Sequence, residues 1–328
     1  MATEHFTSKA RIAIGSIWKP LIVTKTNNFE AAKTLFSAII KSIMLYDVGI
    51  WGLQYTAEME RVAVEFEKGF LNVPKYTPGY MIRLETGRTH LDYDIIKKAL
   101  SFCGRLANIR EGRLPRKCWE KMKLQDRTNA DNKKNWISQL KNKLKEYGHI
   151  EDNVENLKTA TVQQSRPSVL CFTGSTIIIQ VLKKIQSKLF ETDQNRMLNS
   201  TYNVIYKRIK DNVTSLRAQY LNLNIPTTIK RIIAQIRLSG KLGWIAKIGN
   251  GLSYKIDGNE ICQMCNRNEK EDIVHVLKKC PQYQQIRPVS LNDMEITDIL
   301  RFNNEKLIWE TVNFIKTSLK VRAFCLGE

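Results

Sequence analysis

The sequence lacks the features of a secreted or membrane-spanning protein. Its longest apolar-leaning run, Val169 to Leu182, is broken by polar residues and is too short to cross a bilayer. No basic flank leads into an apolar core near Met1, and the seven cysteines lie in a long chain, unlike a secreted disulfide framework. We therefore expect an intracellular protein of a reducing compartment with no membrane partner, in either the nucleus or the cytoplasm.

Acidic side chains are scarce relative to basic ones. The chain has 52 Lys and Arg against 32 Asp and Glu, which leaves a net charge of +20. The imbalance is concentrated, because residues 167–251 carry 13 basic and 3 acidic side chains, whereas residues 252–328 carry 11 of each. Such an excess favours phosphate-rich partners, here RNA and/or DNA. A basic surface that serves only solubility would give the same composition.

Apolar residues recur at three- and four-residue steps over much of the chain, which is the period of an amphipathic helix. The first clear stripe runs from Phe29 to Met44, with Asn27 or Asn28 available to cap its start. Similar stripes are present from Ile12 to Ile17, Met59 to Phe70, Ile95 to Leu106, Trp136 to Tyr147, Ile178 to Leu189 and Leu198 to Tyr220. The predicted fold class is mainly α.

Changes in composition divide the chain into five expected segments. The polar run from Gly148 to Ser165 has no periodicity and is interpreted as a linker. The segments are a helical bundle over 1–110, a basic helical connector and linker over 111–166, a basic helical region over 167–251, a cysteine-containing module over 252–286 and a C-terminal helical tail over 287–328.

The module over 252–286 has its own local pattern. Asp257-Gly258 favours a tight turn, since Gly tolerates positive φ. The segment from Leu252 through Tyr254, Lys255 and Ile256 leads to this dipeptide, and Glu260 and Ile261 follow it. This arrangement predicts a short β-hairpin that turns at Asp257-Gly258 and delivers the chain to Cys262.

Four potential metal ligands follow with the spacing C-x2-C-x9-H-x4-C: Cys262, Cys265, His275 and Cys280. A C-x2-C knuckle and a second pair from a following helix can complete a tetrahedral Cys3His site for Zn²⁺. Four protein ligands leave no position for water, so the zinc would be structural. His275 and Cys280 are about 140° apart on a regular helix, so Cys280 must leave the helix, and Pro281 biases it away from the α region.

The alternative to a zinc site is that Cys262 and Cys265 are a chance or redox pair and that His275 and Cys280 are unrelated polar and core positions. A spaced set of four ligands is the stronger pattern. Three thiolates and Zn²⁺ leave a charge near −1, which nearby basic residues could offset while facing phosphate. The candidate phosphate contacts are Lys183, Lys184, Lys207, Arg208, Lys230, Arg231, Arg237, Arg267, Lys278 and Lys279.

Three stretches of the chain carry a family likeness. Phe36 to Gly52 reads FSAIIKSIMLYDVGIWG, Leu71 to Leu91 reads LNVPKYTPGYMIRLETGRTHL, and Ile233 to Tyr283 contains IRLSG, the cysteine knuckle, HVLKKC and PQY. In this order they resemble the C-terminal part of the reverse transcriptase of LINE-type, non-LTR retrotransposons, especially those of insects. Asp47 departs from the family pattern, which usually has a small residue there.

The resemblance implies that residues 1–110 are a thumb-like helical bundle and that the zinc segment follows the polymerase. Two-metal nucleotidyl transfer requires carboxylates that bind Mg²⁺. No Asp-Asp dipeptide occurs in the sequence, and Asp92 and Asp94 are expected at a helix start instead. We therefore expect no catalytic residue here, since the catalytic palm of the family would precede residue 1.

Two functions remain as hypotheses. The first is a nucleic-acid-binding C-terminal fragment of this RNA-directed DNA polymerase family, which lacks the catalytic palm and is expected to be inactive alone. A separate polymerase chain is a candidate partner. The second is a protein-interaction adapter, derived from a mobile element, in which the zinc module docks another protein.

Overall fold

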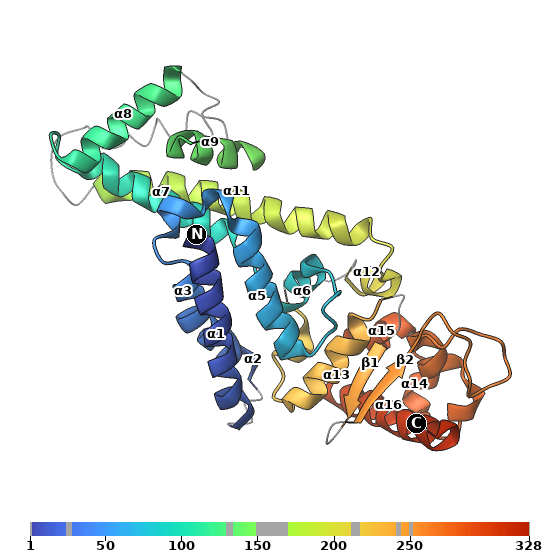
Figure 1. Cartoon of the computed structure of the whole chain (residues 1–328). Coiled ribbons are helices and arrows are strands. Elements are labelled where there is room, and N and C mark those ends of the chain that lie inside the picture. The colour runs from blue at the N-terminus through green and yellow to red at the C-terminus, as the bar shows by residue number, and fades with distance from the viewer. Residues whose placement is uncertain are drawn as a thin grey trace. The chain divides into compact units, whose positions relative to one another are not determined.

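The computed structural model describes residues 2–23, 28–128, 134–148, 170–210, 217–240, 244–248 and 252–327 (Figure 1). These residues are mainly helical and include one two-stranded antiparallel sheet. The predicted mainly α fold class is therefore confirmed. The linker predicted from Gly148 to Ser165 lies, from residue 149 onward, outside the described residues, as does Asn27.

The helices and strands have the following bounds. In the first half of the chain they are α1 (Ala2–Val23), α2 (Phe29–Leu35), the π-helix η1 (Phe36–Lys41), α3 (Ser42–Met44), α4 (Val48–Trp51), the 3₁₀ helix η2 (Gly52–Gln54), α5 (Thr56–Leu71), α6 (Gly79–Thr86), α7 (Asp92–Asn108), α8 (Leu114–Thr128) and α9 (Trp136–Glu146). In the second half they are α11 (Leu170–Leu198), α12 (Val204–Lys210), η4 (Gln219–Leu221), α13 (Thr227–Arg237), β1 (Trp244–Ile248), β2 (Leu252–Ile256), the π-helix η5 (His275–Lys279), η6 (Pro281–Tyr283), α14 (Val289–Asn292), α15 (Ile296–Arg301) and α16 (Glu305–Leu326).

The described chain forms two compact units. Unit 1 comprises Met1–Ser16, Leu35–Ala63 and Thr89–Thr192, and unit 2 comprises Ile17–Thr34, Val64–Arg88 and Asp193–Glu328. Residues 1–110, which the sequence groups into one bundle, contribute to both units. The cysteine-containing segment from Cys262 to Cys280 and the helices α14, α15 and α16 belong to unit 2 alone.

Unit 1 is built around the contact between α4 and α7. Gly49 makes this contact possible, because a Cβ at this position would lie 2.8 Å from the backbone oxygen of Lys98. Trp136 of α9 donates a hydrogen bond from Nε1 to the carbonyl of Gly49 at 3.0 Å. Asp92 starts α7 as the sequence predicts, and its carboxylate also accepts a hydrogen bond from the hydroxyl of Tyr147.

Unit 2 packs α13 against β1, α15 and α16. Its interior contains apolar side chains from α13, α15 and α16, among them Ile233, Leu300 and Val312, none of which is measurably exposed. The stripe predicted from Leu198 to Tyr220 is not one helix. Asn203 interrupts it, and its side-chain oxygen accepts a hydrogen bond from the backbone N–H of Tyr206 at the start of α12.

The predicted β-hairpin has a different partner from the one expected. Leu252–Ile256 is a strand, but it pairs with Trp244–Ile248, which precedes it, and not with Glu260 and Ile261. Asp257 instead starts a turn in which its carboxylate accepts a hydrogen bond from the N–H of Asn259 at 2.9 Å. The prediction of a hairpin turning at Asp257-Gly258 was wrong because a local turn signal does not specify which strand will pair.

No single helix among the described residues has both the length and the apolar content needed to cross a membrane. One pair of helical segments, Phe29–Met44 and Val48–Gln54, meets both criteria together but is bent by 54°.

Candidate metal centre

Cys262 lies on a short backbone ladder that follows β2, and Cys265 lies in the loop that this ladder closes. Ile261 and Lys270 form an isolated antiparallel bridge. The N–H of Cys262 donates to the carbonyl of Glu269 at 2.8 Å, and the N–H of Glu271 donates to the carbonyl of Glu260 at 2.9 Å. These bonds close the loop from Cys262 to Glu269, and they fix the knuckle that carries Cys262 and Cys265.

The second pair of residues comes from η5 and its end. The carboxylate of Asp272 accepts a hydrogen bond from the N–H of His275 at 2.7 Å, which satisfies a free donor at the start of the helical turn. The N–H of Cys280 donates to the carbonyl of His275 at 2.8 Å, five residues earlier. Cys280 itself has left the helical conformation, with φ −62° and ψ 120°, before Pro281. The predicted exit of Cys280 from the helix is therefore confirmed.

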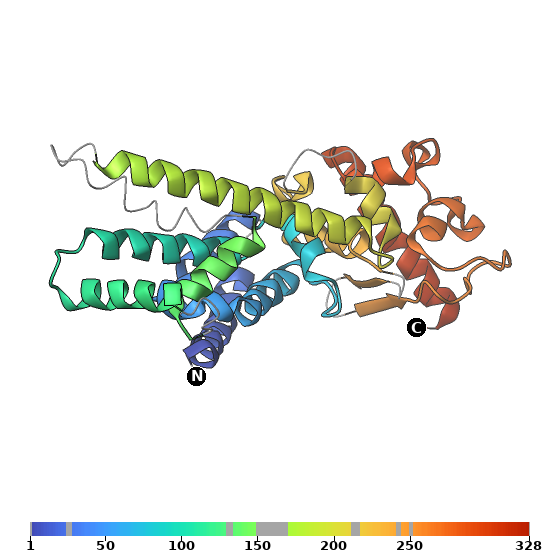
Figure 2. The same ribbon diagram turned by 90° about the horizontal axis from the view of Figure 1, so that it is seen from above.

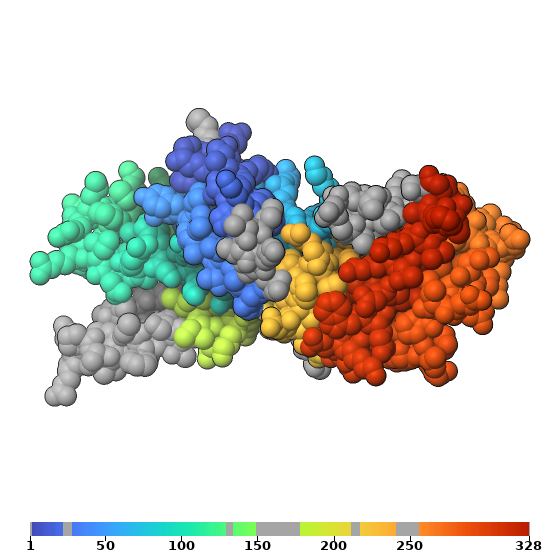
Figure 3. Space-filling model, turned by 90° about the horizontal axis from the view of Figure 1, so that it is seen from below, coloured from blue at the N-terminus to red at the C-terminus, as the bar shows by residue number. Residues whose placement is uncertain are grey.

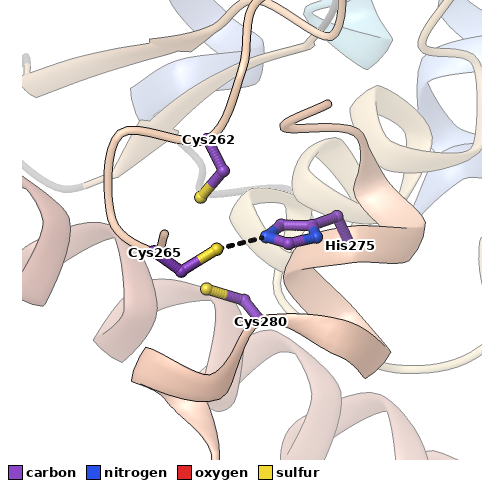
Figure 4. A group of neighbouring side chains, drawn as sticks. All are labelled: Cys262, Cys265, His275 and Cys280. Carbon is purple, nitrogen blue, oxygen red and sulfur yellow. Dashed lines mark hydrogen bonds between the residues drawn. The ribbon is translucent and has the colours of Figure 1, made fainter. Parts of the chain in front are cut away.

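The four side chains converge on one point (Figure 4). One ligand atom from each of Cys262, Cys265, His275 and Cys280 lies within 4.8 Å of the other three, and all four residues are buried. Nε2 of His275 lies 3.4 Å from Sγ of Cys265. In a tetrahedral site with Zn–S of about 2.3 Å and Zn–N of about 2.0 Å, ligand atoms lie roughly 3.5–3.8 Å apart. The cluster has the composition and size to hold a metal ion.

A carboxylate orients the imidazole. Oε2 of Glu269 lies 3.2 Å from Nδ1 of His275, and Nζ of Lys279 lies 3.5 Å from the same carboxylate oxygen. A hydrogen bond from Nδ1–H to this oxygen holds the tautomer in which Nε2 carries the free lone pair. Nε2 is the nitrogen that faces the sulfur atoms. The sequence pattern of ligands gave no indication of this role for Glu269.

Two of the thiols, those of Cys262 and Cys280, are in an environment that opposes their ionisation without a cation. Burial raises the pKa of Cys262 to about 12, with further increases from the neighbouring Cys280 and Glu271. Burial also raises the pKa of Cys280, to which Cys265 contributes as well. Three clustered thiolates would repel one another, and a bound divalent cation supplies the positive charge that stabilises them.

The C-terminal helix anchors this segment within unit 2. Arg322 of α16 donates hydrogen bonds to both carboxylate oxygens of Glu271, at 3.0 and 3.3 Å, and both side chains are buried. The ring of Tyr283 packs edge-on against Phe314 of the same helix. In Figure 3 α16, in red, runs along the orange residues that include this segment. The sequence gave no sign of the Glu271–Arg322 pair.

The ten predicted phosphate contacts fall into three groups in the structure. Lys230 and Arg237 are buried, so the prediction that they meet phosphate is corrected: Lys230 donates to the carbonyl of Leu221 at 2.9 Å, and Arg237 pairs with Glu85 at 2.6 Å. Three more are partly buried and donate to backbone carbonyls, namely Lys207, Arg231 and Lys278. The other five, all exposed, are Lys183, Lys184, Arg208, Arg267 and Lys279.

No relative of known function helps to assign this site. Comparison with protein-family models, with curated proteins and with solved structures finds no match to this chain. The assignment therefore rests on the residues and their geometry.

Proposed function

We propose that this chain is a nucleic-acid-binding, C-terminal part of a non-LTR retrotransposon reverse transcriptase that folds around one structural Zn²⁺. The observation that carries the proposal is the convergence of Cys262, Cys265, His275 and Cys280, whose ligand atoms lie within 4.8 Å of one another. The family assignment rests on the three stretches of sequence that resemble the thumb and zinc regions of that family.

The ligand set favours zinc in a structural role. Thiolate-rich sites select zinc, Cu(I) or iron–sulfur clusters, and a set of three sulfurs and one imidazole with tetrahedral spacing is typical of zinc. A water-activating site needs an open coordination position, whereas this cluster offers four buried protein ligands. The ion would therefore hold the knuckle, η5 and the end of η5 together and would perform no chemistry on a substrate.

The charge of the chain supports a phosphate-rich partner. A net charge of +20 raises the local concentration of nucleic acid around the protein. Lys183, Lys184 and Arg208 remain exposed on α11 and α12, where phosphate can reach them. We propose that binding is mainly electrostatic and that any polymerase activity requires a separate catalytic part.

The proposal is tested by measuring zinc content and nucleic-acid binding on the same preparations. Elemental analysis of the full chain is expected to give one zinc per molecule and less than one in Cys280→Ser. RNA and DNA binding by fluorescence anisotropy at two salt concentrations is expected to weaken steeply with salt. Exposed Cys118→Ser is the matched control, and it should keep the metal.

Each contrary result points to a different conclusion. Absence of zinc from the wild-type chain would remove the metal site. Zinc without any RNA or DNA binding, combined with salt-resistant binding to a partner protein, would replace the proposal with a protein-interaction adapter. Primer extension by the isolated chain with Mg²⁺ would show that it is a complete polymerase.

A further inference from the structure

Helix α8 in unit 1 has one face that is held and one that is open. It packs against α7 and α9, and Figures 1 and 2 show the three helices together. Its buried residues are Arg116, Trp119 and Asp126, and each lies on the face that contacts a neighbouring helix. The opposite face is exposed and carries Lys117 and Lys121.

Arg116 fixes the start of α8 to the end of α7. Its Nη1 donates to the carbonyls of Leu106 and Ala107, at 3.2 and 2.7 Å, in the last turn of α7, where carbonyls lack the regular intrahelical partner. The carbonyl of Leu106 also accepts from the N–H of Ile109 at 3.4 Å. Its Nε donates to Glu120 one turn later at 2.8 Å. The arginine is thus used for structure, and it also occupies the carboxylate of Glu120.

The second half of α8 is tied to α9 in the same manner. Asp126 accepts a hydrogen bond from the hydroxyl of Ser138 and pairs with Nζ of Lys141 at 2.9 Å. The side chain of Asn135 donates to the carbonyl of Met122 at 2.8 Å. Trp119 packs against Trp136 with ring centroids 6.0 Å apart. These contacts hold α8 in a fixed orientation and occupy the other acidic side chain of the helix.

Three exposed basic side chains follow the open face at four-residue steps: Arg113, which directly precedes α8, and Lys117 and Lys121 within it. We call them the basic ridge. All three are exposed, and none has an ion-pair partner among the described residues. With a rise of 1.5 Å per residue, successive members are about 6 Å apart along the helix axis. The carboxylates closest in sequence within α8 are already engaged by Arg116 and Lys141.

We propose that the basic ridge binds the phosphate backbone of nucleic acid. A DNA strand places one phosphate about every 3.4 Å along the duplex axis, so a ridge of about 12 Å can follow three or four consecutive phosphates. The inference rests on the proposed function and adds to it a contact surface, since the ten basic residues predicted from sequence do not include these three. It does not depend on the metal.

The apolar content of the same face favours nucleic acid over a lipid surface. A helix that lies on a membrane buries a continuous apolar stripe below its basic residues. The large apolar side chains exposed on α8 are Leu114 and Leu124, 73% and 62% exposed, at the two ends of the helix. They are ten residues and nearly three turns apart, so no such stripe is present.

The test compares two variants of the full chain that lose the same charge. One variant, Arg113→Gln/Lys117→Gln/Lys121→Gln, removes the ridge. The matched control, Lys75→Gln/Lys306→Gln/Lys320→Gln, removes three exposed lysines from unit 2. Circular dichroism checks that both fold, and the probes are a fluorescein-labelled mixed-sequence 20-mer DNA duplex and a single-stranded RNA of equal length.

Affinity is measured by anisotropy over a series of NaCl concentrations. Loss of two or three phosphate contacts is expected to reduce the slope of log K against log salt by about 2–3, since each contact contributes about 0.9. The control variant should keep most of the wild-type slope. A ridge variant with the wild-type slope, or an equal loss in both variants, would overturn the assignment of the ridge while leaving nucleic-acid binding by the chain intact.

Two further outcomes bear on the basic ridge and on the proposed function. No salt-dependent binding of the wild-type chain to either probe would overturn both. Vesicles containing phosphatidylserine serve as the second arm of the experiment. If the ridge variant loses vesicle binding but binds DNA and RNA normally, the ridge is a lipid-binding surface and the proposal is wrong.

Discussion

Unit 2 contains two buried polar centres that differ in how their charge is compensated. At the first, Glu85 of α6 pairs with Arg237 of α13 at 2.6 Å and accepts a hydrogen bond from the hydroxyl of Tyr206 at 3.0 Å. At the second, the metal cluster, three thiols and one imidazole face one another. The first centre contains both signs of charge, whereas the second contains only groups that bind a cation.

The ion pair is complete within the chain. Burial disfavours ionised Glu85, but the charge and hydrogen bonds of Arg237, with Lys210 and Tyr206, outweigh this, and the pKa of Glu85 is lower than usual. At the metal cluster burial is not offset, and the pKa of Cys262 rises to about 12. The comparison teaches that a buried centre with its own counter-charge needs no ion from solution, whereas a centre without one depends on such an ion.

The largest difference between the two centres is expected when the metal is removed. Structural zinc contributes on the order of 10 kcal/mol to the folding of small zinc peptides, so a chelator is expected to abolish the hydrogen-exchange protection of amides from Cys262 to Cys280. Amides of α6 and the middle of α13 should keep theirs. Mass-spectrometric hydrogen exchange with and without a chelator measures both. Unchanged protection at the cysteines would show that the cluster is stable without an ion.

The next largest effect is expected from breaking the ion pair. Glu85→Gln leaves the guanidinium of Arg237 buried without its counter-charge, which should cost about 3–5 kcal/mol in the free energy of unfolding. Urea unfolding measures the change. The control is Glu85→Leu/Arg237→Met, which removes both charges and is expected to recover most of the loss. A double variant as unstable as Glu85→Gln would contradict the account of burial given above.

Acid is expected to lower the free energy of unfolding more for the wild type, with its ion pair, than for the apolar double variant. The pKa of Glu85 is lowered in the folded state, so its contribution is present above an unfolded-state value of about 4.3 and is lost as pH falls through the folded value. The loss is about 1.4 kcal/mol for each unit by which folding lowers the pKa. Unfolding free energies from pH 6 to pH 2 should therefore fall more for the wild type than for Glu85→Leu/Arg237→Met. Parallel curves would exclude this contribution.

The smallest effect concerns a lysine beside the metal cluster. Nζ of Lys278 donates to the carbonyls of Leu291, Asn292 and Met294 at 2.6–2.7 Å, so it closes the end of α14. Lys278→Ala is expected to lower the free energy of unfolding by about 1–2 kcal/mol and to leave the salt dependence of RNA binding unchanged. An exposed lysine of α16 gives the control, since Lys320→Ala should change stability by less than about 0.5 kcal/mol. A reduced salt slope for Lys278→Ala would restore its predicted role at phosphate.

The metal ligands and most helices could be predicted because their signals are local. The stripe from Ile95 to Leu106 corresponds to α7, and the four ligands lie within nineteen residues whose spacing alone indicates a tetrahedral site. Pro281 correctly indicates that Cys280 leaves the helix. Periodicity and ligand spacing describe neighbours along the chain, and these features need no others.

The wrong predictions share one cause, namely that the interacting residues lie apart in the sequence and no local pattern connects them. Arg237 was expected at phosphate, but its partner Glu85 is 152 positions earlier, and no sequence pattern connects them. The strand Leu252–Ile256 was recognised, yet its pairing with Trp244–Ile248 depends on which edge is available in the fold. A count of basic residues does not show which of them are exposed, because some are buried and neutralised by carboxylates from distant parts of the chain.

The pair formed by Glu271 and Arg322 has a consequence for how this protein can change over generations. Both side chains are buried, and loss of either one alone would leave a charge stranded in the interior. The two positions lie 51 residues apart in the chain. Among descendants of a common ancestor we expect the two residues to be kept together or replaced together. Substitutions in α16 at this position are therefore expected to accompany substitutions in the cysteine segment.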